Sequence, residues 1–361
     1  MARRQRCSWC GMQLLVPPEA PTIQCAVCHG ITQVPRPVDP FGVSGRYRGF
    51  TNNYGTTATN NSPGFRGYGS YPQPPRPQPP LMAPSAYGRK RALLCGIRYH
   101  GQSHGLKGSV NDVMCMREFL IDNLGFPSDC ILMLTDSKNE RNPLKFPTKH
   151  NMIMALRWLV QGCQSGDSLV FHFSGHGSRV QDVNMDEIDG YDEALCPVDY
   201  ESQGKIVDDE INDIIVRPLP RGAKLHAIFD TCYSGTVLDV PYICRMNREG
   251  LYLWQDQRRY AAIYKGTSGG LAVSISACDD NQTGAADTPI LSGNTMGTLT
   301  YSFIQAVQKE PGLTYGRLLN AMRRTIREAK VGIAGLRTEI SQEPQLASSE
   351  KFEIYSTKIV L

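Results

Sequence analysis

The sequence predicts an α/β fold with a mostly parallel central sheet flanked by helices, preceded by a small cysteine-rich module and a flexible linker. Two observations predict it. Short apolar runs alternate with helical stretches after residue 89, and the composition shifts sharply twice before that point. Of the 361 residues, 41% are hydrophobic and 20% are charged, which is enough to bury a large core. Every uninterrupted apolar run is far shorter than the ~18 residues that span a bilayer, which excludes a transmembrane protein.

Composition divides the chain into three parts. Residues 1–36 hold four cysteines, residues 37–88 form a Gly/Pro-rich linker, and residues 89–361 form one globular domain. Half of residues 71–84 are proline, which excludes a helix or a paired strand there.

The elements of the globular domain follow from its apolar pattern. Short apolar runs are typical of strands buried on both faces, and apolar residues at helical spacing indicate amphipathic helices. In a parallel sheet, functional residues lie on loops beyond the carboxyl ends of the strands. The predicted strands cover 92–97, 130–134, 168–173, 225–229 and 271–276, and the predicted helices cover 111–124, 151–164, 301–307 and 315–329.

Four cysteines of the first module have the spacing of a metal site. They form two C-x-x-C pairs, Cys7 with Cys10 and Cys25 with Cys28. Four thiolates in such pairs match a closed tetrahedral zinc site, whose binding energy folds a module too small for a core. Four unrelated cysteines and a redox pair are the alternatives. The redox pair is disfavoured because neither motif has a strand–helix context.

Two predicted strands run into the residues of a nucleophilic site. The strand over 168–173 is followed by Ser174-Gly175-His176-Gly177, and the strand over 225–229 by Asp230-Thr231-Cys232. An exposed histidine can act as a base near pH 7, and a nearby histidine makes a thiol nucleophilic. The separation of the two residues agrees with the roughly 50 residues found in caspases. The alternative is an inert strand-end cysteine; His172, inside the apolar run, is expected to be a packing histidine.

These residues carry a family resemblance. Residues 89–361 resemble the metacaspases, which are caspase-fold cysteine peptidases of clan CD, family C14. The resemblance extends over 89–97, 106–112, 189–199, 206–211 and 274–280. The cysteine-rich module resembles the LSD1-type zinc finger, so the chain is similar to plant type I metacaspases with such a prodomain. The resemblance implies a large-subunit part at about 89–240, a linker at about 241–270 and a small-subunit part at about 271–361.

The resemblance also implies roles for single residues. It implies a catalytic dyad of His176 and Cys232, with the backbone N–H groups of Gly177 and Cys232 as oxyanion donors. It implies that the basic side chain of the substrate binds among Asp112, Ser174 and Asp230. The structural alternative is that Asp112 caps its helix and that Asp230 holds a loop amide.

The stretch over 182–213 is strongly acidic. It holds twelve Asp and Glu residues and one basic residue, Lys205, although the whole chain has a net charge of only +4. We expect most of these carboxylates to be solvated. Adjacent Asp208 and Asp209 repel each other unless a cation intervenes, and oxygen ligands from several loops suit calcium. The resemblance implies calcium ligands at Asp192, Asp208, Asp209 and Asp239.

Together these features predict a calcium-dependent cysteine endopeptidase that cleaves proteins after Arg or Lys. We expect an autoprocessed zymogen that acts in programmed cell death or stress responses, with structural zinc and activating calcium. We expect regulatory proteins to bind the finger and the proline-rich arm, no nucleic-acid or membrane partner, a monomer, and a cytoplasmic location with the nucleus as a second compartment. The alternative is a zinc-finger adaptor with a weakly active caspase-like domain. We expect self-cleavage between the nucleophile strand and Leu271, where the basic residues are Arg245, Arg248, Arg258, Arg259 and Lys265. We expect the cluster Arg89, Lys90 and Arg91 to be the place where the prodomain is released.

Overall fold

The computed structural model describes residues 89–232, 234–260, 263–276, 288–289, 295–332 and 343–361, and four short strands near the N-terminus. The chain divides into two compact units, Met1–Ala83 and Pro84–Leu361. The expected zinc ligands Cys7, Cys10, Cys25 and Cys28 and the expected linker over 37–88 lie outside the described residues. In the first unit, β1 (Arg3–Arg6) pairs antiparallel with β2 (Gln13–Val16), and β3 (Thr22–Gln24) pairs antiparallel with β4 (Ile31–Gln33).

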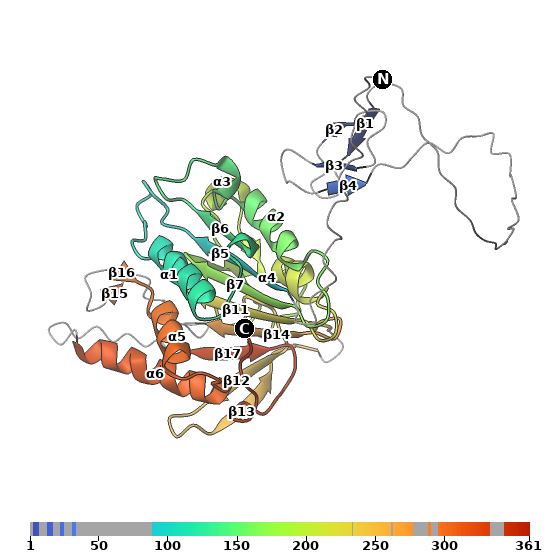
Figure 1. Cartoon of the computed structure of the whole chain (residues 1–361). Coiled ribbons are helices and arrows are strands. Elements are labelled where there is room, and N and C mark those ends of the chain that lie inside the picture. Colours follow the sequence, from blue (N-terminus) through green and yellow to red (C-terminus); the bar gives the residue numbers. More distant parts are fainter. Residues whose placement is uncertain are drawn as a thin grey trace, which may run out of the picture. The chain divides into compact units, whose positions relative to one another are not determined.

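An eight-stranded mixed sheet forms the centre of the second unit (Figure 1). Its order is β13-β12-β17-β14-β11-β7-β5-β6, and the five strands from β14 to β6 are parallel, as the sequence predicts. The strands are β5 (Lys90–Gly96), β6 (Ile131–Thr135), β7 (Ser168–Ser174), β11 (Lys224–Asp230), β12 (Tyr242–Met246), β13 (Tyr252–Asp256), β14 (Leu271–Ser276) and β17 (Gln345–Ser348).

Three antiparallel strands of this sheet were not among the predicted elements. β12 and β13 fall in the stretch that the resemblance assigns to a linker, and β17 follows the last helix. β12 lies between β17 and β13, so it is paired on both sides. Asn247 supports the turn of the β12–β13 hairpin, because its Oδ1 accepts the amides of Glu249 and Leu251. Much of this stretch is therefore an ordered part of the sheet.

Helices cover both faces of the sheet (Figure 1). Alternate residues of β5 point to opposite faces, so that Ala92 and Leu94 belong to one apolar core and Leu93 and Cys95 to the other. Burial on both faces explains why the strands read as continuous apolar runs. None of the described helices is both long and apolar enough to cross a bilayer. On one face lie α1 (Ser109–Asp122), α5 (Thr298–Lys309) and α6 (Tyr315–Gly332), and on the other α2 (Lys149–Val160) and α4 (Asp208–Ile211).

A smaller antiparallel sheet follows the carboxyl end of β7. It has the order β10-β9-β8 and carries the acidic stretch.

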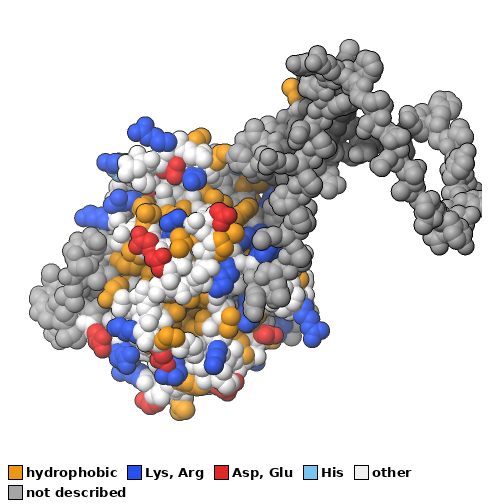
Figure 2. Space-filling model, viewed as in Figure 1, with side chains coloured by type: hydrophobic (Ala, Val, Ile, Leu, Met, Phe, Trp, Pro, Cys, Tyr) orange, Lys and Arg blue, Asp and Glu red, His pale blue; other side chains and the backbone are white. Residues whose placement is uncertain are grey.

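Figure 2 shows acidic and basic side chains interspersed on the visible face of this unit, with no large basic patch there. The remaining elements are β8 (Gly177–Gln181), β9 (Tyr191–Leu195), β10 (Ile206–Val207), β15 (Thr288–Pro289), β16 (Thr295–Met296), α3 (Tyr200–Gln203), 3₁₀ turns over Ser128–Cys130 and Pro143–Lys145, and a π-helical segment over Asn212–Val216.

The buried histidine of β11, His226, predicts that the protein loses stability in acid. Burial lowers the pKa of His226 to about 3, and its Nε2 lies 2.7 Å from the Tyr315 hydroxyl. The unfolded chain takes up this proton near pH 6.5, whereas native His226 stays neutral, so the protein loses stability as the pH falls below 6.5. The expected loss is about 1.4 kcal/mol per pH unit from His226. Urea unfolding between pH 4 and 7 should show this slope removed in His226→Gln. It should be retained in the exposed-site control His150→Gln, and an unchanged slope in His226→Gln contradicts the assignment.

Candidate active site

The carboxyl ends of adjacent parallel strands bring the expected dyad residues together. The sheet register pairs Ser174 of β7 with Asp230 of β11, so the segments that follow, with His176 and Cys232, leave the sheet side by side. Both His176 and Cys232 are half-buried. A Cβ atom on Gly177 would overlap the carbonyl oxygen of Cys232, so only glycine permits this approach of the two chains.

Two further residues fix the position and tautomer of His176. Its Nε2 lies 2.7 Å from the His104 carbonyl oxygen. A carbonyl can only accept, so we assign the proton to Nε2, which leaves Nδ1 as the basic nitrogen. The His176 amide donates to the Tyr99 hydroxyl at 2.8 Å, and this hydroxyl donates to the Cys196 carbonyl at 2.6 Å. Tyr99 has a φ of 52°, a left-handed conformation that is rare outside glycine.

The expected substrate pocket is one buried polar site at the start of α5. The Ser174 hydroxyl donates to Asp112 at 2.6 Å, and the Gly297 amide donates to the other oxygen of Asp112 at 2.7 Å. The amide and the hydroxyl of Thr300 both donate to Oδ2 of Asp230 at 2.8 Å. A Cβ on Gly297 would overlap the Asp230 carboxylate and lie 2.8 Å from Asp112 Oδ2, so the two carboxylates flank this glycine. Asp112, Ser174 and Asp230 are each at most 2% exposed.

The structural alternatives for these residues have different outcomes. Gly108, four residues before Asp112, is the N-cap of α1, and the Asp112 carboxylate accepts hydrogen bonds from Ser174 and Gly297. Asp230 does hold an amide, that of Thr300. Burial raises the pKa of Asp230, against the hydrogen bonds from Thr300 that lower it.

His172 is buried, as expected of a packing histidine, but it also supports the pocket. Its Nε2 lies 3.0 Å from Thr300 Oγ1. Because the Thr300 hydroxyl donates to Asp230, Nε2 must donate to Thr300. Burial lowers the pKa of His172 to about 3, so the ring is neutral. A hydrogen-bond chain from His172 through Thr300 therefore ends on the Asp230 carboxylate.

The acidic stretch folds into a largely buried cluster. The expectation that most of its twelve carboxylates are solvated is wrong, because the fold packs β8, β9 and α4 around half of them. The six at most 9% exposed are Asp182, Asp186, Glu187, Asp192, Glu193 and Asp208, and Asp239 from beyond the stretch joins them at 5%.

Two of the four expected calcium ligands lie in groups whose oxygens are close enough to share a cation. Asp192 groups with Asp182 and Asp186, and Asp239 groups with Asp186 and Glu187. The family pattern did not include Asp182, Asp186 or Glu187, and only their place in the acidic stretch pointed to them.

The other two expected ligands are held by hydrogen bonds. The two oxygens of Asp208 accept the amides of Asp209 and Glu193, and Asp209 accepts the side-chain amide of Asn184 at 2.7 Å. Burial, then repulsion from Asp239, raises the pKa of Asp208.

The donor set fits a hard divalent cation. Burial, and after it repulsion from Asp209, raises the pKa of Asp192 to about 6. Within the part of the chain that the structure describes, Oδ1 of Asp186 and Oδ1 of Asp192 are buried and have no hydrogen-bond partner. Carboxylate oxygens with excess negative charge are the ligands that calcium prefers.

A histidine base and a cysteine on adjacent parallel strand ends, beside a buried acidic pocket, are the arrangement of a cysteine peptidase. The metacaspase peptidase C14 domain matches residues 90–241, and the LSD1 zinc finger matches residues 7–31. Metacaspase-3 of Arabidopsis thaliana is 49% identical over 99% of both chains, and Metacaspase-1 of the same plant is 48% identical over 98% of this chain and 95% of its own. The chain therefore belongs to the metacaspase family and is a cysteine endopeptidase with an LSD1-type zinc finger.

Among solved structures, Caspase-1 from Spodoptera frugiperda is 10% identical and has a TM-score of 0.43, covering 76% of this chain and 89% of its own. The caspase-like fold class follows from the family and from the observed sheet with helices on both faces.

Proposed function

We propose that this metacaspase is a calcium-dependent endopeptidase that cleaves proteins after arginine or lysine, with Cys232 as nucleophile and His176 as base. The observation that carries the proposal is the convergence of Asp112, Ser174 and Asp230 at the strand edge that also carries the two catalytic candidates.

The chemistry follows from the tautomer of His176. Nδ1 takes the thiol proton of Cys232, and the thiolate attacks the carbonyl carbon of the scissile bond. The N–H groups of Gly177 and Cys232 stabilise the negative charge that develops on the carbonyl oxygen. His176 then protonates the leaving amine, and water hydrolyses the resulting thioester. The His104 carbonyl stabilises the imidazolium by accepting a hydrogen bond from its Nε2–H group.

Specificity for a basic residue follows from the two carboxylates. Asp112 and Asp230 repel an acidic side chain and pair with a cation, and the planar fork of arginine can engage carboxylates bidentately. Both carboxylates are closed off from solvent and held by the first residues of α5. We therefore propose that activation opens this pocket, as a zymogen requires.

Self-cleavage is expected where basic residues are accessible. Arg248 and Arg259 are exposed, whereas Arg245 lies in a strand paired on both sides and Lys265 is only 3% exposed. We propose Arg248 and Arg259 as processing positions ahead of the other two. We further propose that cleavage at Arg89 releases a prodomain and that the finger binds zinc. The remaining parts of the proposal are the recruitment of regulators and a role in cell death or stress.

Calcium dependence has a direct test. Turnover of an arginine peptide should be at least about tenfold higher in millimolar calcium than in chelator, because a cation that binds only the competent state shifts the population toward it. Asp192→Asn should weaken this response. The control Asp189→Asn, an exposed carboxylate paired with Arg179, should leave it unchanged. Equal turnover in chelator and in calcium contradicts the calcium part of the proposal.

A further inference from the structure

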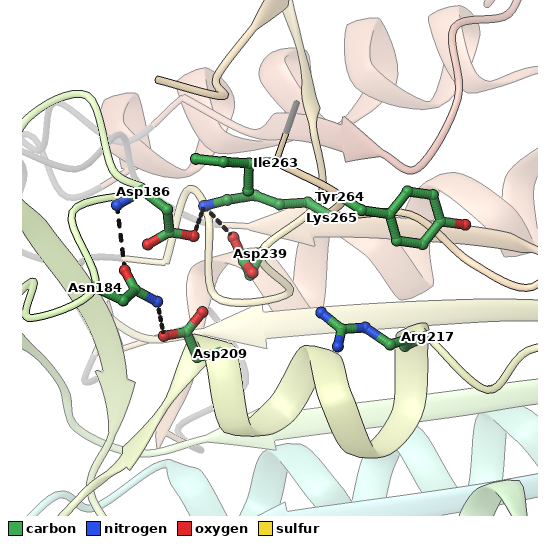
Figure 3. Close-up of a pocket in the computed structure, with 8 residues that line it drawn as sticks. All are labelled: Asn184, Asp186, Asp209, Arg217, Asp239, Ile263, Tyr264 and Lys265. Atoms are coloured by element: carbon green, nitrogen blue, oxygen red, sulfur yellow. Dashed lines mark hydrogen bonds and ion pairs between the residues drawn. The ribbon is translucent and has the colours of Figure 1, made fainter. Parts of the chain in front are cut away.

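One ammonium group occupies the acidic cluster. The Nζ atom of Lys265 lies 3.0 Å from Asp186 Oδ2 and 2.5 Å from Asp239 Oδ1 (Figure 3). It also lies 2.5 Å from Glu187 Oε1. The side chain is 3% exposed, so these are buried ion pairs and not a transient surface contact. The three carboxylates are the same ones whose oxygens are close enough to share a metal ion.

The charge at this position is not balanced. Lys265 supplies one positive charge against three carboxylates, which leaves a negative excess in a buried site. In the described part of the chain, Oδ1 of Asp186 is buried without a hydrogen-bond partner. A divalent cation would meet this excess more fully than the ammonium does.

The site has room for exchange. A cavity of about 460 Å³ adjoins the ammonium and is lined by Asn184, Asp186, Asp209, Arg217, Asp239 and Lys265, among others. Figure 3 shows the Lys265 side chain reaching between Asp186 and Asp239, with Asp209 across the cavity. An entering cation and the Lys265 ammonium would therefore compete for the same oxygens.

We propose that Lys265 is a built-in counter-ion of the acidic cluster, and that a divalent cation of the size of calcium binds there by displacing its ammonium group. The proposal rests on the calcium dependence proposed above and adds how the cation-free protein holds its site.

Displacement of Lys265 would also release the chain around it. The Asn212 side-chain amide holds the carbonyls of Asp239 at 2.7 Å and of Lys265 at 3.4 Å, and the Arg259 amide donates to the Asp186 carbonyl at 3.3 Å. The ion pairs of Lys265 and these bonds together hold the stretch that carries Arg259 against the acidic cluster. Cation exchange thus loosens a proposed processing position.

The test replaces, one at a time, two basic side chains that line the same cavity. Both replacements are made in the full-length chain, with Cys232→Ala present to prevent self-cleavage. Lys265→Met removes the ammonium in the cluster. The control Arg217→Met removes a cation that lines the cavity but pairs with Asp213 and is 54% exposed. Calcium titration by calorimetry should give a Kd at least about tenfold lower for Lys265→Met and an unchanged Kd for Arg217→Met. Lys265→Arg, which keeps the charge, should stay close to the wild type.

Thermal unfolding gives a second readout. Without calcium, Lys265→Met should melt below the wild type, because three buried carboxylates then face one another alone. Its Tm should rise more on adding calcium than that of the wild type. The control Arg217→Met should show neither change.

The outcomes separate this inference from the proposed function. Equal calcium affinity in Lys265→Met and wild type overturns the inference and leaves calcium dependence standing. Calcium binding by Lys265→Met but not by the wild type would show that the cation cannot displace the ammonium, and it overturns both the inference and calcium dependence. Absence of binding in both overturns both.

Discussion

Replacement of Cys232 by alanine should lower kcat/KM for an arginine peptide by about 10⁴-fold or more, with no change in the fold. Loss of the nucleophile removes the covalent intermediate, and effects of this size are measured when the nucleophile of a peptidase is deleted. His176→Ala should have a similar effect, since the two residues act as a unit. Steady-state kinetics at equal concentrations of folded protein measures both losses.

A matched cysteine control excludes a general thiol effect. Cys163 lies at the opposite end of the sheet, near Asp167 and Arg91, and burial raises the pKa of its thiol. Cys163→Ala should therefore keep full activity. Residual activity above about 1% in Cys232→Ala, or an equal loss in Cys163→Ala, would rule out Cys232 as the nucleophile.

Replacement of Asp230 by asparagine should lower kcat/KM for arginine peptides by about 10²-fold or more and erase the discrimination against aspartate peptides. Loss of one partner of a buried charge pair costs about 3–5 kcal/mol, which corresponds to such factors. Thr300→Val should show the same trend more weakly and mainly through KM, because it removes the hydroxyl that joins Asp230 to His172. Peptides that vary only the residue before the scissile bond measure the change.

The control for Asp230 is another buried carboxylate of the same sheet. Asp167 is 3% exposed, pairs with Arg89 at 3.1 Å and lies at the opposite end of β7. Asp167→Asn should lower stability without changing the preference for arginine. Asp230→Asn that keeps a full basic preference, or wild type that cleaves aspartate peptides equally fast, contradicts the pocket assignment.

The parallel half of the fold could be predicted because its strands are buried on both faces and bounded by polar residues. All five predicted strands lie in the observed parallel set, with ends that differ by at most two residues. The predicted helix over 151–164 stops at Val160, because Gly162 turns the chain with a φ of 58°. β17 was missed because its four residues, Gln-Leu-Ala-Ser, carry no apolar run and gain their place only by pairing with β12 and β14.

The site residues that lie near predicted strands could be predicted from the sequence, whereas those held by long-range contacts could not. His176, Cys232 and Asp230 lie on or just after predicted strands, so the strand-end rule found them. His104 lies 72 residues from the histidine it holds, and Lys265 lies 78 residues from Glu187. No helix or strand periodicity relates positions this far apart in the sequence, so these contacts could not be predicted from it. Tyr99 could have been found by the same rule, since it follows the first predicted strand by two residues.

Intact-mass analysis of wild type and Cys232→Ala, each incubated with millimolar calcium or with chelator, tests the central claim most directly. The predicted result is fragmentation of the wild type in calcium alone, with new termini after exposed basic residues such as Arg248 or Arg259. Cys232→Ala should stay intact in both conditions. Fragments in Cys232→Ala, fragmentation of the wild type in chelator, or cleavage after acidic residues would contradict the account.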